Sequence, residues 1–327
     1  MGSIFRCPRC RHDLPGWPPP YACHVCGRSI PRVGDIIVLT DDAVFDLDGE
    51  RQYVGYDEVA EGYACHVDPP DLEHQFHVGW GTVIREIVGA DARVLDLACG
   101  PGKLSCELAR RGCRVVAGDI SLAMLRFVAE RLPEAPPQSL LPCRLNAYDL
   151  PIADGALDAV VAFSFFFLVG SPERVVAEVK RVLRPGGALI VNEPGDPVPS
   201  DDRVTEIIRK ARRAYSEALA RRGAVGLPLH WPLGWPISRS KEELPRLFPH
   251  YEGLNSDSLA FRYTETPGNY LRRLASRYTA FQVGLDPQVH AQAVAEVRAE
   301  LMEEYGAGFD EIEQEYRRHD WPHIFRT

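Results

Sequence analysis

The sequence predicts an α/β protein with a doubly wound, mostly parallel sheet, preceded by a small metal-bound module. Two observations support this prediction. Residues 93–191 alternate short apolar strands with amphipathic helices, which is typical of a parallel sheet covered by helices on both faces. Four of the nine cysteines form two CxxC pairs near the N-terminus, a spacing typical of a tetrahedral metal site.

The two CxxC pairs are Cys7-Pro-Arg-Cys10 and Cys23-His-Val-Cys26. Two residues between thiolates allow one tight turn to direct both sulfurs at a single ion, and four thiolates leave no open position for water. We therefore expect a structural zinc ribbon whose folding depends on the metal. A pair of disulfides or a redox CxxC motif are the alternatives, although a redox motif would not need a second copy.

The elements of the sheet follow from apolar runs and their boundaries. Ser121 is placed to cap the second helix, and a Gly-rich turn precedes the last strand. The expected strands are 93–98, 114–118, 140–145, 157–164 and 188–191, and the expected helices between them are 103–111, 122–131 and 172–183.

A ligand site is expected beyond the carboxyl ends of these strands, where parallel sheets of this kind bind ligands. Asp96 lies near the end of the first strand, and Gly100 and Gly102 remove side chains where backbone must approach a ligand closely. Asp119 ends the second strand, where its carboxylate can accept both hydroxyls of a ribose. The loop lacks the GxGxxG pattern, so a charge-neutralised nucleoside is favoured over a dinucleotide.

Five motifs in order resemble the class I S-adenosylmethionine-dependent methyltransferases, most closely the group that includes the ubiquinone and menaquinone methylases. The resemblance covers about residues 50–195. The motifs are Val94-Leu-Asp-Leu-Ala-Cys-Gly-Pro-Gly102, Gly118-Asp119-Ile-Ser, Asp149-Leu-Pro151, Asp154-Gly-Ala-Leu-Asp158 and Arg181-Val-Leu-Arg-Pro-Gly-Gly187.

This resemblance implies a seven-stranded Rossmann-like sheet and a bound S-adenosylmethionine. It also implies that tyrosines of an N-terminal helix close over the methionine end of the cofactor, although ordinary helix packing would equally explain them. Family members usually have Asp where this chain has Asn146. The implied cofactor-binding residues are Tyr56, Tyr63, Asp96, Ala98, Gly100, Gly102, Asp119, Ile120, Asn146, Ala147 and Phe163.

Methyl transfer from a sulfonium needs alignment more than a strong base, but a hydroxyl acceptor would gain from one. The candidate bases are Glu193 after the last strand, His74 and His77 before the first, and His230 in a later Pro- and Trp-rich segment. For each histidine a structural role is the alternative. The run Phe163-Ser-Phe-Phe-Phe-Leu-Val169 suits an apolar acceptor, and strand burial explains it equally well.

Five units are expected along the chain: a zinc ribbon (1–34), a linker and N-terminal helices (35–90), a catalytic core (91–195), a helical lid insertion (196–250), and the last strands with C-terminal helices (251–327). Within the last two units we expect a basic helix over 203–223, the last strand pair of the sheet within 254–264, and closing helices over 266–282 and 287–316.

Composition limits the function. The 327 residues are 45% hydrophobic and 25% charged, as in ordinary globular proteins, and the net charge of −9 argues against binding nucleic acid over the whole surface. No apolar run reaches the roughly 20 residues that span a bilayer, and no apolar signal region precedes Cys7, so a cytoplasmic protein is expected.

Three functions remain open at this point. The first is methylation of a small, partly apolar metabolite. The second is methylation of ribosomal or transfer RNA, because ribosomal RNA guanine methyltransferases similarly place a zinc module before this domain and residues 1–34 contain five arginines. Those arginines could instead neutralise the thiolates and an acidic neighbouring surface. The third is non-catalytic cofactor binding, with the ribbon as a protein-docking module.

Overall fold

The computed structural model describes residues 4–40, 46–47, 50–51, 56–66, 69–224, 237–277 and 282–327. Its centre is a nine-stranded sheet in the order β13-β16-β11-β10-β7-β8-β9-β4-β3. Seven of these strands, from β13 to β9, form the predicted doubly wound sheet, in which only β16 runs antiparallel to its neighbours. The strands are β7 (Arg93–Leu97), β8 (Arg114–Asp119), β9 (Leu140–Arg144), β10 (Leu157–Val161), β11 (Leu183–Glu193), β13 (His250–Gly253) and β16 (Trp321–Arg326).

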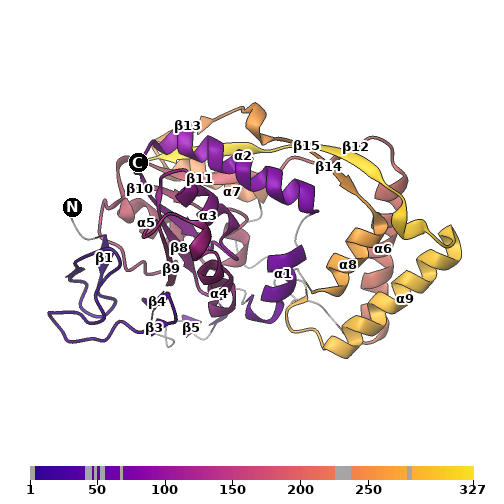
Figure 1. Cartoon of the computed structure of the whole chain (residues 1–327), viewed down its shortest axis with the longest axis horizontal. Helices are drawn as coiled ribbons and strands as arrows, with labels where there is room; N and C mark the ends of the chain where they lie inside the picture. The colour runs from indigo at the N-terminus through magenta and orange to yellow at the C-terminus, as the bar shows by residue number, and fades with distance from the viewer. Residues whose placement is uncertain are drawn as a thin grey trace.

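Helices cover both faces of this sheet, as predicted (Figure 1). On one face α2, α3 and α4 bury residues such as Trp80, Leu108 and Leu125 against the strands. On the other face α5 contributes Val175, Val179 and neighbouring residues, and α7 contributes Leu244. The helices are α2 (Pro70–Val88), α3 (Lys103–Arg110), α4 (Leu122–Glu130), α5 (Pro172–Val182) and α7 (Ile237–Leu247).

The ribbon extends the sheet instead of standing apart from it. β1 (Phe5–Arg6) pairs with β2 (Asp13–Leu14), and β3 (Arg32–Val33) pairs with β4 (Ile36–Val38). β4 then runs parallel to β9, with Ile37 opposite Cys143. A separate hairpin joins β5 (Asp46–Leu47) to β6 (Glu50–Arg51). The N-terminal module therefore supplies two strands that a sheet of seven would lack.

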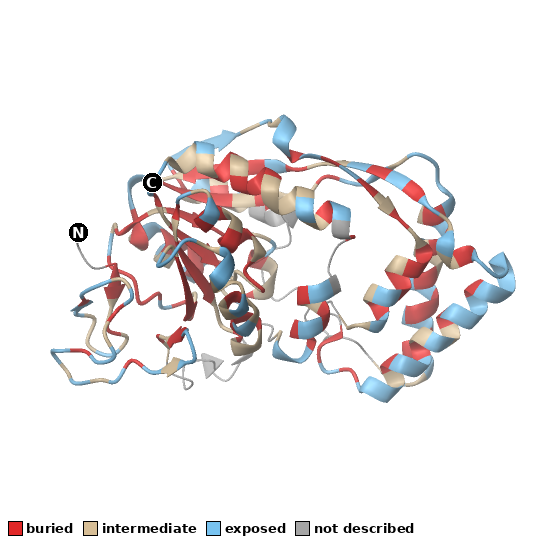
Figure 2. Ribbon diagram, viewed as in Figure 1, coloured by how far each residue is buried: buried red, intermediate tan, exposed pale blue. Residues whose placement is uncertain are grey.

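A helical unit forms the far end of the molecule (Figure 1). It consists of α6 (Arg203–Arg221), α8 (Pro267–Ala275) and α9 (Pro287–Tyr305), which share a core of their own that includes Leu271 and Val297. Figure 2 shows buried residues on the inner faces of these helices and exposed residues on the outer ones. The predicted basic helix over 203–223 is confirmed as α6.

Two expectations about the C-terminal part are wrong. The last strand pair of the main sheet is β13 with β16, because residues 260–265 instead form β14 (Ala260–Glu265) in a three-stranded sheet with β15 (Gln314–His319) and β12 (Val198–Pro199). The closing helix expected over 287–316 ends at Tyr305, where Gly306 adopts a positive φ of 80° that favours glycine. Residues 314–316, expected in this helix, instead begin β15.

The N-terminal segment before the sheet holds a short helix, α1 (Ala60–His66), which follows the single turn η2 (Asp57–Val59). Figure 1 shows α1 between α4 of the core and α8 of the helical unit. Among the described residues, no helix combines the length and the apolar character needed to cross a membrane.

Candidate functional site

A cavity of about 270 Å³ opens at the carboxyl ends of β7, β8 and β10, beneath η2 and α1. Its lining comes from four places: the two N-terminal tyrosines, the glycine turn, the end of β8 with the start of α4, and the segment after β10. The lining residues are Tyr56, Tyr63, Ala98, Gly100, Asp119, Ile120, Ser121, Met124, Phe163, Ser164, Phe165, Phe167, Leu168 and Val169. Seven of the predicted cofactor-binding residues are therefore brought together here.

The turn after β7 exposes backbone to this cavity. Ala98 and Gly100 have positive φ angles of 59° and 53°, which turn the chain sharply between the strand and α3. A Cβ on Gly100 would point toward the Tyr63 ring, 3.6 Å away. Gly102 serves packing instead, because a Cβ there would lie only 2.7 Å from Val128 of α4.

Asp119 is the acidic group at the centre of the cavity wall. Its two carboxylate oxygens accept hydrogen bonds from the backbone amides of Gly100 and Ser121, each at 2.9 Å. Burial nevertheless raises the pKa of Asp119 to about 6, because it outweighs the opposing effect of these amides. The carboxylate is thus positioned by the glycine turn and by the N-terminus of α4.

Tyr56 and Tyr63 close the cavity from above. Their rings meet edge to face with centroids 5.4 Å apart, and burial raises the pKa of Tyr56, so its hydroxyl stays neutral. Such a pair offers aromatic faces, which attract a sulfonium or another cation.

Four predicted cofactor-binding residues do not line the cavity. Asp96 lies beneath the glycine turn and accepts a 2.5 Å hydrogen bond from Ser105, while burial raises its pKa to about 7. Gly102 packs on α4, as described above. Asn146 is buried, and its side-chain oxygen accepts a hydrogen bond from the Tyr148 amide at 3.0 Å, while Ala147 packs against the apolar core.

The predicted apolar run after β10 does line the cavity. Its first residue, Phe163, also packs against aromatic residues of α2. Phe163 lies 4.5 Å from Trp80 and 6.2 Å from Phe76 of α2, measured between ring centroids. Ser164 is the polar member of the wall; its φ of 48° is strained, and its amide donates to Asn192 at 3.1 Å. The sequence analysis included Ser164 in the run 163–169 but did not single it out as a lining residue, because a positive φ at a serine leaves no local signal.

None of the described candidate bases lines the cavity. Nδ1 of His77 donates a hydrogen bond to the Glu73 carbonyl of its own helix at 2.7 Å, and burial together with Arg131 lowers the pKa of His77 to about 4. His74 is exposed on the same helix. Glu193 ends β11 at the same edge of the sheet, 2.5 Å from Nε2 of His323. His230 lies outside the described residues.

Glu193 belongs to a chain of polar groups that no sequence pattern indicated. His323 on β16 contacts Glu193 through Nε2 and the Tyr251 hydroxyl on β13 through Nδ1, the latter at 2.7 Å. These three residues are far apart in sequence, and only the pairing of β11, β16 and β13 brings them together.

The four predicted metal ligands form one cluster. Their sulfurs all lie within 4.8 Å of one another, and Cys7–Cys26 and Cys10–Cys23 are each 3.6 Å apart. Sulfurs at the corners of a tetrahedron around zinc would be about 3.8 Å apart for a Zn–S distance of ~2.3 Å. The residues present fit a zinc ion.

Comparison with known proteins agrees with this geometry. A family model described as a methyltransferase domain matches residues 95–191. A demethylmenaquinone methyltransferase from Thermobifida fusca is 41% identical over 151 residues, covering 46% of this chain and 64% of that protein. The corresponding enzyme from Renibacterium salmoninarum is 36% identical over 141 residues, covering 42% of this chain and 57% of that protein.

Residues 95–191 are a methyltransferase domain. This region is similar in sequence to the demethylmenaquinone methyltransferases. The predicted family and enzyme class are confirmed for this domain. The chain spans 64%, 57% and 50% of the first three curated relatives. Among solved structures, a phosphoethanolamine N-methyltransferase from Haemonchus contortus, in complex with S-adenosyl-L-methionine, is 14% identical with a TM-score of 0.46, covering 83% of this chain and 57% of that one.

Proposed function

We propose that this protein transfers a methyl group from S-adenosylmethionine to a small, partly apolar acceptor. The observation that carries the proposal is the position of Asp119 in the cavity, beside Gly100 and below Tyr56 and Tyr63. A carboxylate there suits the two hydroxyls of a ribose, and the exposed backbone of the glycine turn suits the amino-acid end of the cofactor. Ile120 would pack on the adenine.

When bound, S-adenosylmethionine supplies a methyl group on a sulfonium that is already activated for displacement. The protein must then hold the acceptor in line and exclude water, and alignment of this kind supplies about 7–11 kcal/mol of barrier reduction. The aromatic wall of Phe163, Phe165 and Phe167 supports an apolar acceptor surface on one side of the cavity. Tyr56 and Tyr63 would cover the sulfonium.

Glu193 is our preferred general base for a hydroxyl acceptor. It ends a central strand at the cavity edge of the sheet, whereas His77 is bonded within its own helix and His74 faces solvent. The 2.5 Å contact with His323 would hold the Glu193 side chain in one orientation. The carboxylate would take the hydroxyl proton while the oxygen lone pair forms a bond to the methyl carbon; the methyl–sulfur bond would break, and its electron pair would stay on the sulfur of the departing S-adenosylhomocysteine.

Zinc is the metal we propose for the four-cysteine cluster, in a structural role. Four thiolates complete a tetrahedral shell and leave no position for a catalytic water. The ribbon arginines support a structural reading over RNA binding, because Arg6 and Arg11 form ion pairs with Asp154 and Asp149 of the core.

The test is to incubate the protein with methyl-labelled cofactor and a host extract, and then separate RNA, protein and small molecules. We expect the label in an apolar small-molecule fraction. Label in RNA would overturn the acceptor class, and absence of any transfer despite cofactor binding would favour a non-catalytic role.

A further inference from the structure

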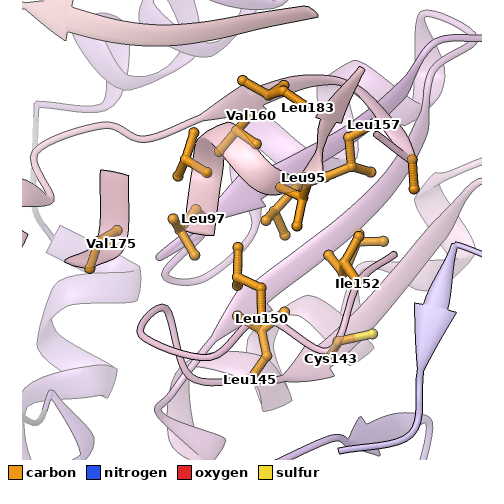
Figure 3. Packing of buried hydrophobic residues seen from close by; sticks show 14 of the residues in the cluster. Leu95, Leu97, Cys143, Leu145, Leu150, Ile152, Leu157, Val160, Val175 and Leu183 are labelled. Atoms are coloured by element: carbon orange, nitrogen blue, oxygen red, sulfur yellow. The ribbon is translucent and has the colours of Figure 1, made fainter. Parts of the chain in front are cut away.

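The ribbon packs on the same side of the sheet as α5 and α7, and its residues join their buried cluster. The connection from β9 to β10, residues 145–156, is fully described and forms turns without a helix. The ribbon residues Phe5, Leu14 and Ile30 are at most 1% exposed and join the same buried cluster as strand residues of the core. Figure 3 shows core members of this cluster, including Leu145, Leu150 and Ile152, with their side chains directed toward one another.

The ribbon holds the segment 149–154 by its backbone and by charge. The Arg6 amide donates to the Pro151 carbonyl at 2.9 Å, and the Ala153 amide donates to the Ile4 carbonyl at 2.8 Å. Arg6 and Arg11 add ion pairs with Asp154 and Asp149, at 2.9 and 2.5 Å. These contacts come from Ile4 and Arg6, just before Cys7, and from Arg11, just after Cys10, so they depend on the fold of the first CxxC turn.

Helix α5 holds the same segment from its other side. Arg181 donates to the carbonyls of Leu150 and Ile152 at 2.8 and 2.7 Å, and the Leu150 amide donates to Glu178 at 2.7 Å. The segment therefore lies between one support that is part of the core and one that belongs to the ribbon.

The segment that directly follows the ribbon also reaches the cofactor cavity: β4 pairs with β3 of the ribbon on one side and with β9 of the core on the other. The Leu39 amide donates to the Arg144 carbonyl at 2.9 Å, and the Arg144 side chain donates to the Ile120 carbonyl at 3.0 Å. The next residue, Leu145, donates its amide to the Asp119 carbonyl at 3.0 Å. Asp119 and Ile120 are the cavity residues that would bind the nucleoside. The strand next to them, β9, pairs with β4, and β4 pairs in turn with β3 of the ribbon.

We propose that metal binding by the four cysteines and cofactor binding at the Asp119 cavity are coupled, so that the metal-loaded ribbon raises the affinity for S-adenosylmethionine. This inference rests on the proposed function. A ribbon of about 30 residues cannot hold its shape by apolar burial alone. Loss of the metal would therefore release segment 149–154 and the outer side of β9, and with them the wall behind Asp119 and Ile120.

The first experiment measures the coupling in both directions. S-adenosylhomocysteine, the stable product, is titrated by calorimetry into the full-length protein loaded with zinc and into the same protein after chelation. We expect at least about fivefold weaker binding without zinc, and by reciprocity a zinc affinity raised by the same factor when S-adenosylhomocysteine is present. Circular dichroism checks that the chelated protein remains folded.

The second experiment keeps the metal and disturbs only the contact. Arg11→Asp places like charges together at Asp149, and the swapped pair Arg11→Asp with Asp149→Arg restores the attraction. We expect Arg11→Asp to retain zinc and to weaken S-adenosylhomocysteine binding about twofold to fivefold, with recovery in the swapped pair. Arg9→Asp is the matched control, because Arg9 is exposed on the same turn and its change alters the net charge equally.

The outcomes separate the coupling from the function. Equal affinity of folded zinc-loaded and zinc-free protein would overturn the coupling and leave the proposed function standing. If chelation unfolds the whole protein, the charge swap decides: unchanged binding by Arg11→Asp, or an equal loss in Arg9→Asp, overturns the coupling. No binding to the zinc-loaded protein would instead reject the proposed function.

Discussion

At the scale of single residues, the charge of Asp119 is subject to two opposing effects. Two backbone amides favour its charged form, yet burial still holds its pKa near 6. We expect Asp119→Ala to weaken S-adenosylhomocysteine binding by about 1–3 kcal/mol, through loss of charge-assisted hydrogen bonds. Calorimetry measures this directly. Asp196→Ala, at an exposed carboxylate, is the control, and an equal effect in both variants would contradict the assignment.

The pKa of Asp119 also predicts a pH dependence of binding. The ligand-free carboxylate takes up a proton as the pH falls through about 6, whereas ribose hydroxyls bind the charged form. Affinity is therefore full above this pH and is lost below it, by about tenfold between pH 7 and pH 5. Titrations across this range in Asp119→Asn should be flat. A wild-type affinity that rises on acidification would show that the sign is wrong.

Glu193 provides a test of the proposed base. Glu193→Gln keeps the size of the side chain but removes the proton acceptor, so we expect kcat to fall about 10²–10⁴-fold for a hydroxyl acceptor with little change in cofactor affinity. Single-turnover assays with the acceptor found by labelling measure this. Tyr251→Phe, at the far end of the His323 contact, should have a much smaller effect. An unchanged rate in Glu193→Gln would mean that the base is another group or is not needed.

At the scale of elements, η2 and the helix α1 that follows it link the cavity to the helical unit. On the core side, Asp57 accepts hydrogen bonds from the Ser121 hydroxyl and the Ala123 amide, at 2.9 and 3.1 Å. On the other side, Glu58 accepts from the Gly284 amide at 2.9 Å, and Gly62 lies directly against the backbone of Ser276. Because Tyr63 follows Gly62, the position of α1 fixes one wall of the cavity.

Gly62→Ala should separate these elements. A Cβ at residue 62 would overlap the carbonyl oxygen of Ser276, and backbone atoms cannot move aside as a flexible side chain can. We expect a loss of about 1–3 kcal/mol in the free energy of unfolding, together with weaker S-adenosylhomocysteine binding because Tyr63 is displaced. Denaturant unfolding and calorimetry measure the two effects. Glu61→Ala, exposed on the same helix, should change neither.

The sequence predicts the parts of the fold that depend on neighbouring residues better than those that depend on pairing between distant segments. Most core strands and helices were predicted to within about three residues because apolar periodicity and the Ser121 cap are local, and Ser121 does accept a hydrogen bond from the Met124 amide at 3.1 Å. The strand predicted over 188–191 is the exception, because β11 begins at Leu183 and includes the residues predicted as a Gly-rich turn. The small sheet was missed, because β12, β14 and β15 pair residues as distant as Val198 and Arg317. No window of sequence contains such a pairing.

The residues of the candidate site also fall into a group that the sequence predicts and a group that it does not. Asp119 and Gly100 follow from motifs at strand ends, which the topology of a parallel sheet places at one edge. The Glu193–His323 contact and the aromatic layer behind Phe163 depend on which strands and helices become neighbours. These groups could not be predicted from spacing, because their partners, His323 and Trp80, lie far from them in the sequence.

At the scale of the whole molecule, the buried clusters divide it differently from the order of the sequence. The ribbon shares a cluster with β7, β9, β10 and α5, whereas α6, α8 and α9 enclose a cluster of their own. The predicted separation of a ribbon from a catalytic core therefore does not correspond to separate apolar cores. Elements that share a core are expected to unfold together.

This arrangement predicts the order of unfolding. The amides of Cys7 and Cys23 donate to the carbonyls of His12 and Arg28. In the zinc-loaded protein these amides should exchange with solvent as slowly as the amides of β7 and β9. Amides of α6 and α9 should form a separate group with its own opening free energy. Native-state hydrogen exchange measured by mass spectrometry, with zinc release followed in the same denaturant series, tests both statements. Zinc release at a denaturant concentration where β7 and β9 stay protected would mean that the ribbon opens alone, and would remove the physical basis for coupling it to the cofactor cavity.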